Sequence, residues 1–150
     1  MMKQLMSILT IALVALFVTS TNYSFAQTKE EHHAKVSEHH AKVLEHAAAI
    51  KDGKSMSKKE MKDHAKQAGE HLAKAKEHHA AMVKKMTAEE KKESSHAAVK
   101  AHHAEAEADH AALTKELSKA KPNEAKVKEH AAKLHEHITK AEAKHVASKK

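Results

Sequence analysis

Apolar residues are sparse between positions 27 and 150, and they recur at spacings of three, four and seven. Such spacings place side chains on one face of an α-helix, so the pattern predicts amphipathic helices. Four apolar faces follow one another along the chain. They consist of Val36, Val43 and Ile50; Leu72, Ala75, His79, Met82 and Met86; Val99, Ala106, Leu113 and Leu117; and Val127, Leu134, Ile138 and Ala141.

Helix-end signals separate these faces. The segments 28–31, 57–60 and 87–90 each begin with Ser or Thr and end with Glu, the spacing of a capping box. Gly53 is a helix stop, and Pro122 breaks the chain again before an asparagine that can cap the last helix. These signals predict helices at about 29–51, 58–86, 88–120 and 124–147. Short connections between four amphipathic helices favour an all-α fold, an antiparallel up-down four-helix bundle.

The predicted bundle has little apolar surface to bury. Its helices consist mainly of strong helix formers such as Ala, Lys, Glu and Leu. The only aromatic residues of the chain are Phe17, Tyr23 and Phe25. Burial contributes about 25 cal/mol per Å² of apolar surface, so an ordinary core cannot be assembled. We therefore expect a marginal fold that is partly disordered without a ligand.

Residues 1–26 have the layout of a secretory signal peptide. Lys3 gives a positive start, residues 5–18 are almost entirely apolar, and small residues lead to Ala26 at the expected cut. The apolar run is shorter than the ~20 residues that span a membrane. We expect a cleaved signal-peptide helix, a mature domain of residues 27–150 without a membrane span, and a periplasmic or secreted protein.

Composition narrows the function classes. The net charge is +7, and all 27 basic residues are lysines. Without arginine for base edges, and without aromatic residues after position 26 for stacking, specific nucleic-acid binding is not expected. The absence of cysteine excludes disulfides and thiolate metal sites. Ser and Thr occur mainly at caps and turns, so the sequence does not predict an enzyme.

Histidine is the residue type that carries chemistry, with 17 copies. Most copies recur at intervals of seven residues within each predicted helix. The series comprise His32, His39 and His46; His64, His71 and His78; His96, His103 and His110; and His130, His137 and, one position off, His145. Seven residues of helix rise about 10.5 Å, which is too far for two rings of one series to hold one ion. Several helices must therefore contribute to a site.

An antiparallel fold with turns near residues 55, 87 and 120 brings the four series into register. Each resulting layer receives one imidazole from every helix. The layers are His32, His78, His96 and His145; His39, His71, His103 and His137; and His46, His64, His110 and His130. Outside the layers we expect His33, His40, His102 and His135.

Acidic residues directly precede nine histidines and can orient ligating rings across helices. They are Glu31, Glu38, Glu45, Asp63, Glu70, Glu77, Asp109, Glu129 and Glu136.

Neutral imidazole is the commonest metal ligand, and twelve aligned copies exceed what packing requires. The sequence therefore predicts a divalent metal-binding protein that acts as a buffer, carrier or scavenger. The bound ion would be Zn(II), Cu(II), Ni(II) or Co(II), and the intrinsic affinity of such a site is highest for Cu(II). Candidate partners, besides the ions, are a metal-handling protein and an anionic envelope polymer.

Two alternatives stay open. The heptads can result from repeat expansion without selection for histidine. The chain can also be a structural or interaction protein of the cell envelope, a Lys/Ala-rich helical module that binds polyanions or partner helices.

Overall fold

The computed structural model describes residues 27–53, 55–92 and 94–148, with only the backbone at Ser94. Over these ranges the chain forms five helices and no strand, which confirms the all-α prediction. The helices are α1 (Lys29–Asp52), α2 (Lys58–Lys84), α3 (Ala88–Lys92), α4 (Ser94–Ser118) and α5 (Glu124–Ala147). The predicted signal peptide, residues 1–26, lies outside the described residues.

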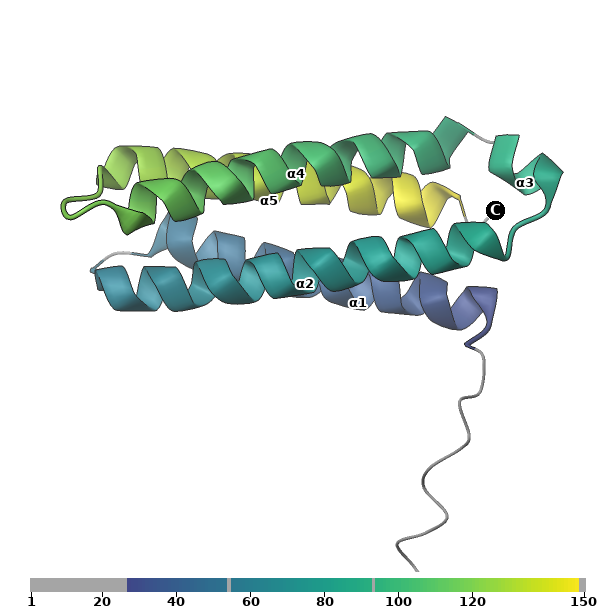
Figure 1. The fold of residues 1–150 in the computed structure, drawn as a ribbon, viewed down its shortest axis with the longest axis horizontal. Coiled ribbons are helices and arrows are strands. Elements are labelled where there is room, and N and C mark those ends of the chain that lie inside the picture. The colour runs from purple at the N-terminus through teal and green to yellow at the C-terminus, as the bar shows by residue number, and fades with distance from the viewer. Residues whose placement is uncertain (1–26, 54, 93, 149–150) are drawn as a thin grey trace, which may run out of the picture.

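The four long helices lie side by side as a bundle, and successive long helices run in opposite directions along it (Figure 1). Helix α1 packs against α2 and α5, and helix α4 packs against the same two neighbours. The single helix predicted at 88–120 is found as the short α3 followed by α4. None of the described helices is both long enough and apolar enough to cross a membrane.

Capping chemistry sets the helix ends where the sequence predicts them. The hydroxyl of Thr28 accepts a hydrogen bond from the Glu31 backbone N–H at 3.1 Å, and the Glu31 carboxylate accepts one from Thr28 N–H at 2.8 Å. The same reciprocal pairs form in segments 57–60 and 87–90. At α5 the Asn123 side chain accepts from Lys126 N–H. Each cap stabilises its helix by about 1 kcal/mol, which matters in a bundle with a small core.

The interior of the bundle changes character along its length. Near the turns that join α1 to α2 and α4 to α5, the core is apolar and includes Ile50, Leu72, Leu117 and Leu134. Alanines fill much of the remaining interior, so the helices approach closely while burying little surface per residue. Toward the opposite end, where α2 leads into α3, the buried side chains include a group of histidines. They are His40, His79, His96, His103 and His145.

Gly69 in the middle of α2 has a packing role that the sequence does not reveal. A Cβ atom at this position would lie 2.5 Å from Cε1 of His110. The His110 ring lies across the glycine, and its Nε2 lies 2.8 Å from the carbonyl oxygen of Ala65. The ring therefore occupies the space that the missing side chain leaves.

Candidate metal-binding histidine clusters

The histidine rings form three groups. Two lie along seams, where two neighbouring helices meet, and one lies in the interior of the bundle. The ladder consists of His32, His39, His46, His64, His71 and His78 on α1 and α2. The buried centre consists of His40, His79, His103 and His145, and the α4–α5 cluster consists of His102, Glu105 and His137.

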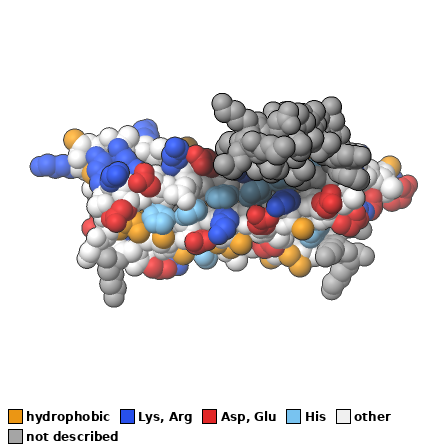
Figure 2. Space-filling model, turned by 90° about the horizontal axis from the view of Figure 1, so that it is seen from below, with side chains coloured by type: hydrophobic (Ala, Val, Ile, Leu, Met, Phe, Trp, Pro, Cys, Tyr) orange, Lys and Arg blue, Asp and Glu red, His pale blue; other side chains and the backbone are white. Residues whose placement is uncertain are grey.

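The ladder pairs its rings across the α1–α2 seam in the register that the heptads predict. Nδ1 to Nδ1 distances are 3.1 Å for His32 and His78, 3.1 Å for His39 and His71, and 3.0 Å for His46 and His64. Seen from below the view of Figure 1, a row of histidines lies along this face of the bundle (Figure 2). The close pairing follows from the short, capped connection between the two helices.

Successive ladder pairs also stack on one another. The rings of His39 and His78 lie 5.5 Å apart and almost parallel, and those of His46 and His71 lie 5.9 Å apart. Burial lowers the pKa of His39 and His46, and a charged partner ring across the seam would lower it further. For His39 and His46 burial therefore favours the neutral ring, which is the form that binds metal.

Each ladder pair has the nitrogen spacing of two adjacent ligands on one ion. With metal–nitrogen bonds of about 2.0–2.1 Å, adjacent ligand atoms lie about 2.8 Å apart in a planar site and about 3.3 Å apart in a tetrahedral one. The observed 3.0–3.1 Å falls between these values. The same spacing fits a hydrogen bond in which one neutral ring donates to the other, so the pair geometry alone does not require a metal.

The buried centre takes one ring from each long helix. His40, His79, His103 and His145 are 0%, 6%, 2% and 0% exposed, respectively. Ring centroids are 5.0 Å apart for His40 and His103, and 5.6 Å apart for His79 and His103. They are 6.0 Å apart for His40 and His145, and 6.3 Å apart for His79 and His145. The four rings thus form a closed circuit inside the bundle.

Hydrogen bonds orient three rings of this centre. His145 Nε2 donates to the backbone carbonyl oxygen of His33 at 2.9 Å, and His40 and His103 are linked to one another. His40 Nδ1 lies 2.6 Å from a carboxylate oxygen of Glu142, which can only accept when ionised, so this nitrogen carries the proton. His40 Nε2 then has a free lone pair and accepts from His103 Nε2, 2.7 Å away. The arrangement is a carboxylate–histidine pair of the kind that fixes the tautomer of metal-ligating rings.

Burial disfavours the charged form of three rings of the centre. It lowers the pKa of His79 to about 4, of His103 to about 3 and of His145 to about 4, and neighbouring imidazoles act in the same direction on all three. For Glu142, burial is the largest single influence and raises the pKa, but hydrogen bonds from His40 and Ser37, together with the neighbouring imidazoles, lower the pKa by more and leave it below its ordinary value. At neutral pH His79, His103 and His145 are therefore neutral, and the Glu142 carboxylate lies beside them.

The α4–α5 cluster combines two imidazoles with a carboxylate near the surface. Glu105 Oε2 lies 2.8 Å from His102 Nδ1 and 2.9 Å from His137 Nδ1. One potential ligand atom from each residue lies within 4.8 Å of the others, close enough to share one ion. The hydrogen bond from His102 is the main reason that the pKa of Glu105 is lowered. The described residues thus contain a candidate His/Glu metal-binding group.

Asp109 extends this cluster along the seam. Its carboxylate lies 3.4 Å from His137 Nε2 and 3.5 Å from His130 Nδ1, on the facing helix. Asp109 is therefore one of the predicted acids that does approach histidines across helices. Several other predicted acids instead engage lysines of their own helix. They are Glu38, Glu45, Glu70, Glu129 and Glu136.

The twelve predicted site histidines do not form layers of four rings. Most of them instead meet a residue of one neighbouring helix. From the first predicted layer, His32 pairs with His78, whereas His96 and His145 lie near His79. From the second, His39 pairs with His71, His103 joins the buried centre, and His137 joins the α4–α5 cluster. From the third, His46 pairs with His64, His110 covers Gly69, and His130 approaches Asp109. Whether these twelve residues bind metal stays a prediction.

Sequence reasoning missed several residues of the clusters. His40 was expected outside the layers, but it is fully buried. His79 was assigned only to an apolar face, and His102 was expected to be peripheral. A usable signal exists, because His40, His79 and His103 are each the second residue of a His–His pair. A rotation of about 100° per residue turns the second ring of each pair toward a different neighbour from the first.

No protein-family model, curated protein or solved structure matches this chain. Its function is therefore inferred from the chemistry of its own residues.

Proposed function

We propose that the protein binds divalent transition-metal ions as a buffer, carrier or scavenger outside the cytoplasm. The observation that carries this proposal is the α4–α5 cluster, in which His102, Glu105 and His137 offer three ligand atoms within 4.8 Å of one another. Two imidazoles and one carboxylate form a donor set suited to Zn(II), Cu(II), Ni(II) or Co(II). Water would complete the coordination sphere.

The position of this cluster suits reversible loading. Glu105 is exposed and both histidines are only half-buried, so an ion can enter and leave without opening the bundle. Asp109 beside His137 supplies further negative charge that favours a cation. Fast exchange at an exposed site is what a buffer or carrier requires. The ladder adds three further two-nitrogen sites along the opposite pair of helices.

The fold and the location form part of the same proposal. An up-down four-helix bundle with a small apolar core gains stability when ions link its helices, because binding to the folded state alone stabilises it. Removal of residues 1–26 during export would place the domain in the periplasm or the extracellular medium. There it would meet metal ions directly, and a metal-handling protein or an anionic envelope polymer is a candidate partner.

The proposal is tested by metal analysis after equilibrium dialysis against each of Zn(II), Cu(II), Ni(II) and Co(II). The variant His102→Ala/His137→Ala should lose at least one equivalent relative to the unmodified protein. The matched control is His135→Ala, which removes one imidazole of α5 outside the defined groups. Equal retention by the double variant and the control would contradict the assigned site. If the unmodified protein retains none of the four metals, the rival function as a polyanion-binding envelope module is favoured.

A further inference from the structure

The histidine end of the bundle has an interior that packing alone does not explain. His79 is 6% exposed and His145 is fully buried, yet His79 Nε2 and His145 Nδ1 have no hydrogen-bond partner among the described residues. A buried polar atom without a partner costs about 1–3 kcal/mol. Leucine at either position would avoid this cost, and a bundle with so small a core has little stability to lose.

We infer that His40, His79, His103 and His145 form a second, buried metal site, where four imidazoles from the four long helices take one divalent transition-metal ion. This inference deepens the proposed function, on which it rests, by adding a site of a different kind. The α4–α5 cluster would exchange ions at the surface, whereas the buried centre would retain one.

The ring spacing fits a single ion. When nitrogen ligands lie about 2.0–2.1 Å from a metal, the ring centroids of neighbouring imidazoles are about 5 Å apart in a tetrahedral site. The circuit of the buried centre has sides of 5.0, 5.6, 6.0 and 6.3 Å. A tetrahedral site would require the longer sides to shorten by about 1 Å. It would also require the opposite rings, His40 with His79 and His103 with His145, to approach to the same distance, so the four rings would have to draw together around the ion.

The centre already has the hydrogen bonding of a ligated site. Glu142 holds His40 with Nδ1 protonated, so the Nε2 lone pair points at His103. An ion between His40 and His103 would replace their mutual hydrogen bond, with the ring proton of His103 moving from Nε2 to Nδ1 so that Nε2 can ligate. The unpartnered nitrogens of His79 and His145 would gain a partner. Four neutral imidazoles without a thiolate favour Cu(II), Zn(II) or Co(II) over Mg(II) or Ca(II), which prefer oxygen ligands.

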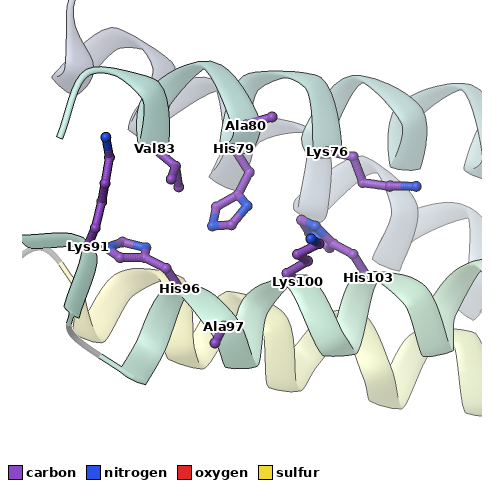
Figure 3. Close-up of a pocket in the computed structure, with 9 residues that line it drawn as sticks. All are labelled: Lys76, His79, Ala80, Val83, Lys91, His96, Ala97, Lys100 and His103. Carbon is purple, nitrogen blue, oxygen red and sulfur yellow. The ribbon is translucent and has the colours of Figure 1, made fainter. Parts of the chain in front are cut away.

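A groove between α2 and α4 gives the centre a route to solvent. Its volume is about 440 Å³, and its lining includes His79, His96 and His103. Figure 3 shows the His79 and His103 rings directed into this space from the two helices. Lys76, Lys91 and Lys100 also line the groove. Their positive charge opposes a bare cation, so we expect slow entry and slow release, in contrast to the exposed α4–α5 cluster.

Co(II) is the probe that separates the two sites. Tetrahedral Co(II) with four nitrogen ligands absorbs strongly in the visible range, whereas a five- or six-coordinate ion with water ligands absorbs weakly. The experiment measures bound Co(II) by dialysis and records its visible spectrum for the unmodified protein, for His79→Leu, and for the matched variant His102→Ala/His137→Ala. Leucine is similar in volume to histidine and removes an unpartnered nitrogen, so His79→Leu should fold, as circular dichroism can verify.

We expect His79→Leu to lose one equivalent of bound Co(II) and the strong visible absorption. The matched variant His102→Ala/His137→Ala should keep the Co(II) of the buried centre and its absorption. A second variant, Glu142→Gln, keeps all four rings and should weaken Co(II) binding at this site 10- to 100-fold, the usual effect of losing an orienting carboxylate. Chelator should remove this equivalent more slowly than the others.

The outcomes distinguish the two proposals. If His79→Leu binds as many equivalents as the unmodified protein with the same spectrum, the buried site is wrong. If, in that case, the matched variant still loses an equivalent, the proposed function stands without the buried site. If only His79→Leu loses an equivalent of Co(II), the buried site is supported and the α4–α5 cluster is wrong as a metal site. No Co(II) bound by the unmodified protein would overturn the buried site, and failure to retain Zn(II), Cu(II) and Ni(II) as well would overturn the proposed function.

Discussion

Gly69 and His110 fill one space in the bundle. The imidazole lies where a Cβ on residue 69 would stand, 2.5 Å from the ring Cε1, and the ring is held there through the carbonyl oxygen of Ala65. A glycine inside a helix costs about 1 kcal/mol relative to alanine. Contact with the His110 ring, together with its hydrogen bond, offsets that cost.

The substitution Gly69→Ala should therefore raise the free energy of unfolding by much less than helix propensity suggests. The added methyl displaces the His110 ring and breaks a hydrogen bond that contributes about 1 kcal/mol. In a His110→Ala background the same change should recover the full gain of about 1 kcal/mol. Urea unfolding of the two single variants and the double variant measures this coupling. Equal gains in both backgrounds would show that the ring does not depend on the glycine.

Replacement of a ladder pair should stabilise the metal-free protein. His39 and His71 satisfy one another's Nδ1 atoms, and removing both partners together leaves no unpaired group. For His39→Leu/His71→Leu we expect the free energy of unfolding to rise by about 1–2 kcal/mol, because apolar surface replaces polar atoms at a largely buried seam. In the presence of Zn(II) or Cu(II), the same variant should gain less stability from the ion than the unmodified protein does.

A loss of stability in the metal-free double variant would contradict this expectation. It would mean that the paired rings themselves hold α1 against α2. The single variant His39→Leu serves as the control, since it leaves His71 without its partner and should gain less than the double variant.

Glu105→Gln should weaken metal binding at the α4–α5 cluster. The amide keeps the size of the side chain and can still accept from His102, but it lacks the negative charge that attracts the ion. We expect at least a tenfold weaker affinity, equivalent to about 1.4 kcal/mol, by calorimetric titration with Zn(II). Glu107→Gln is the matched control, because Glu107 pairs with Lys76 across α2 and α4 and lies outside the cluster. Equal affinities in the two variants would exclude Glu105 as a ligand.

The all-helical fold and the pairing of α1 with α2 could be predicted from the sequence for a physical reason. Capping residues define both ends of the connection between these helices, and a short connection allows few registers. The heptad spacing then fixes which rings meet, so His39 faces His71 as expected. The predicted apolar faces are likewise buried, as at Val43 and Leu134.

The buried centre could not be predicted because it depends on helix rotation. Four helices can turn any of several faces inward when alanine is common on all of them. The heptad series suggested that His39 faces the axis, but it lies with His71 at the α1–α2 seam, and the next residue, His40, turns inward instead. Contacts of α5 with α1, between segments far apart in sequence, place His145 beside His40. Local patterns carry no information on such contacts.

Acid should destabilise the metal-free protein, because burial lowers the pKa of three rings in its interior. The values are about 4 for His79, about 3 for His103 and about 4 for His145, against about 6.5 in an unfolded chain. Between these limits the unfolded chain binds more protons than the folded one, so stability falls as pH drops below about 6.5 and levels off near pH 3. One pKa unit is about 1.4 kcal/mol, so the shift of each ring corresponds to about 3–5 kcal/mol. Together they are comparable to the 5–15 kcal/mol that stabilises a typical domain, and helix content should be lost between pH 6.5 and 4.

A melt series from pH 8 to pH 3, followed by circular dichroism without metal, measures this fall. The matched comparison is His79→Leu, which removes one titrating ring from the centre and should shift the transition to lower pH.

Neighbouring charges act in both directions: Lys76 lowers the pKa of His103, whereas Glu142 raises that of His145. Burial is the largest cause for all three rings, so the sign of the effect does not depend on these charges. A flat profile down to pH 4 would place the rings in contact with water, because exposed imidazoles have the same pKa in the folded and unfolded chain and leave stability unchanged. A bundle interior built on four buried histidines would then have to be abandoned.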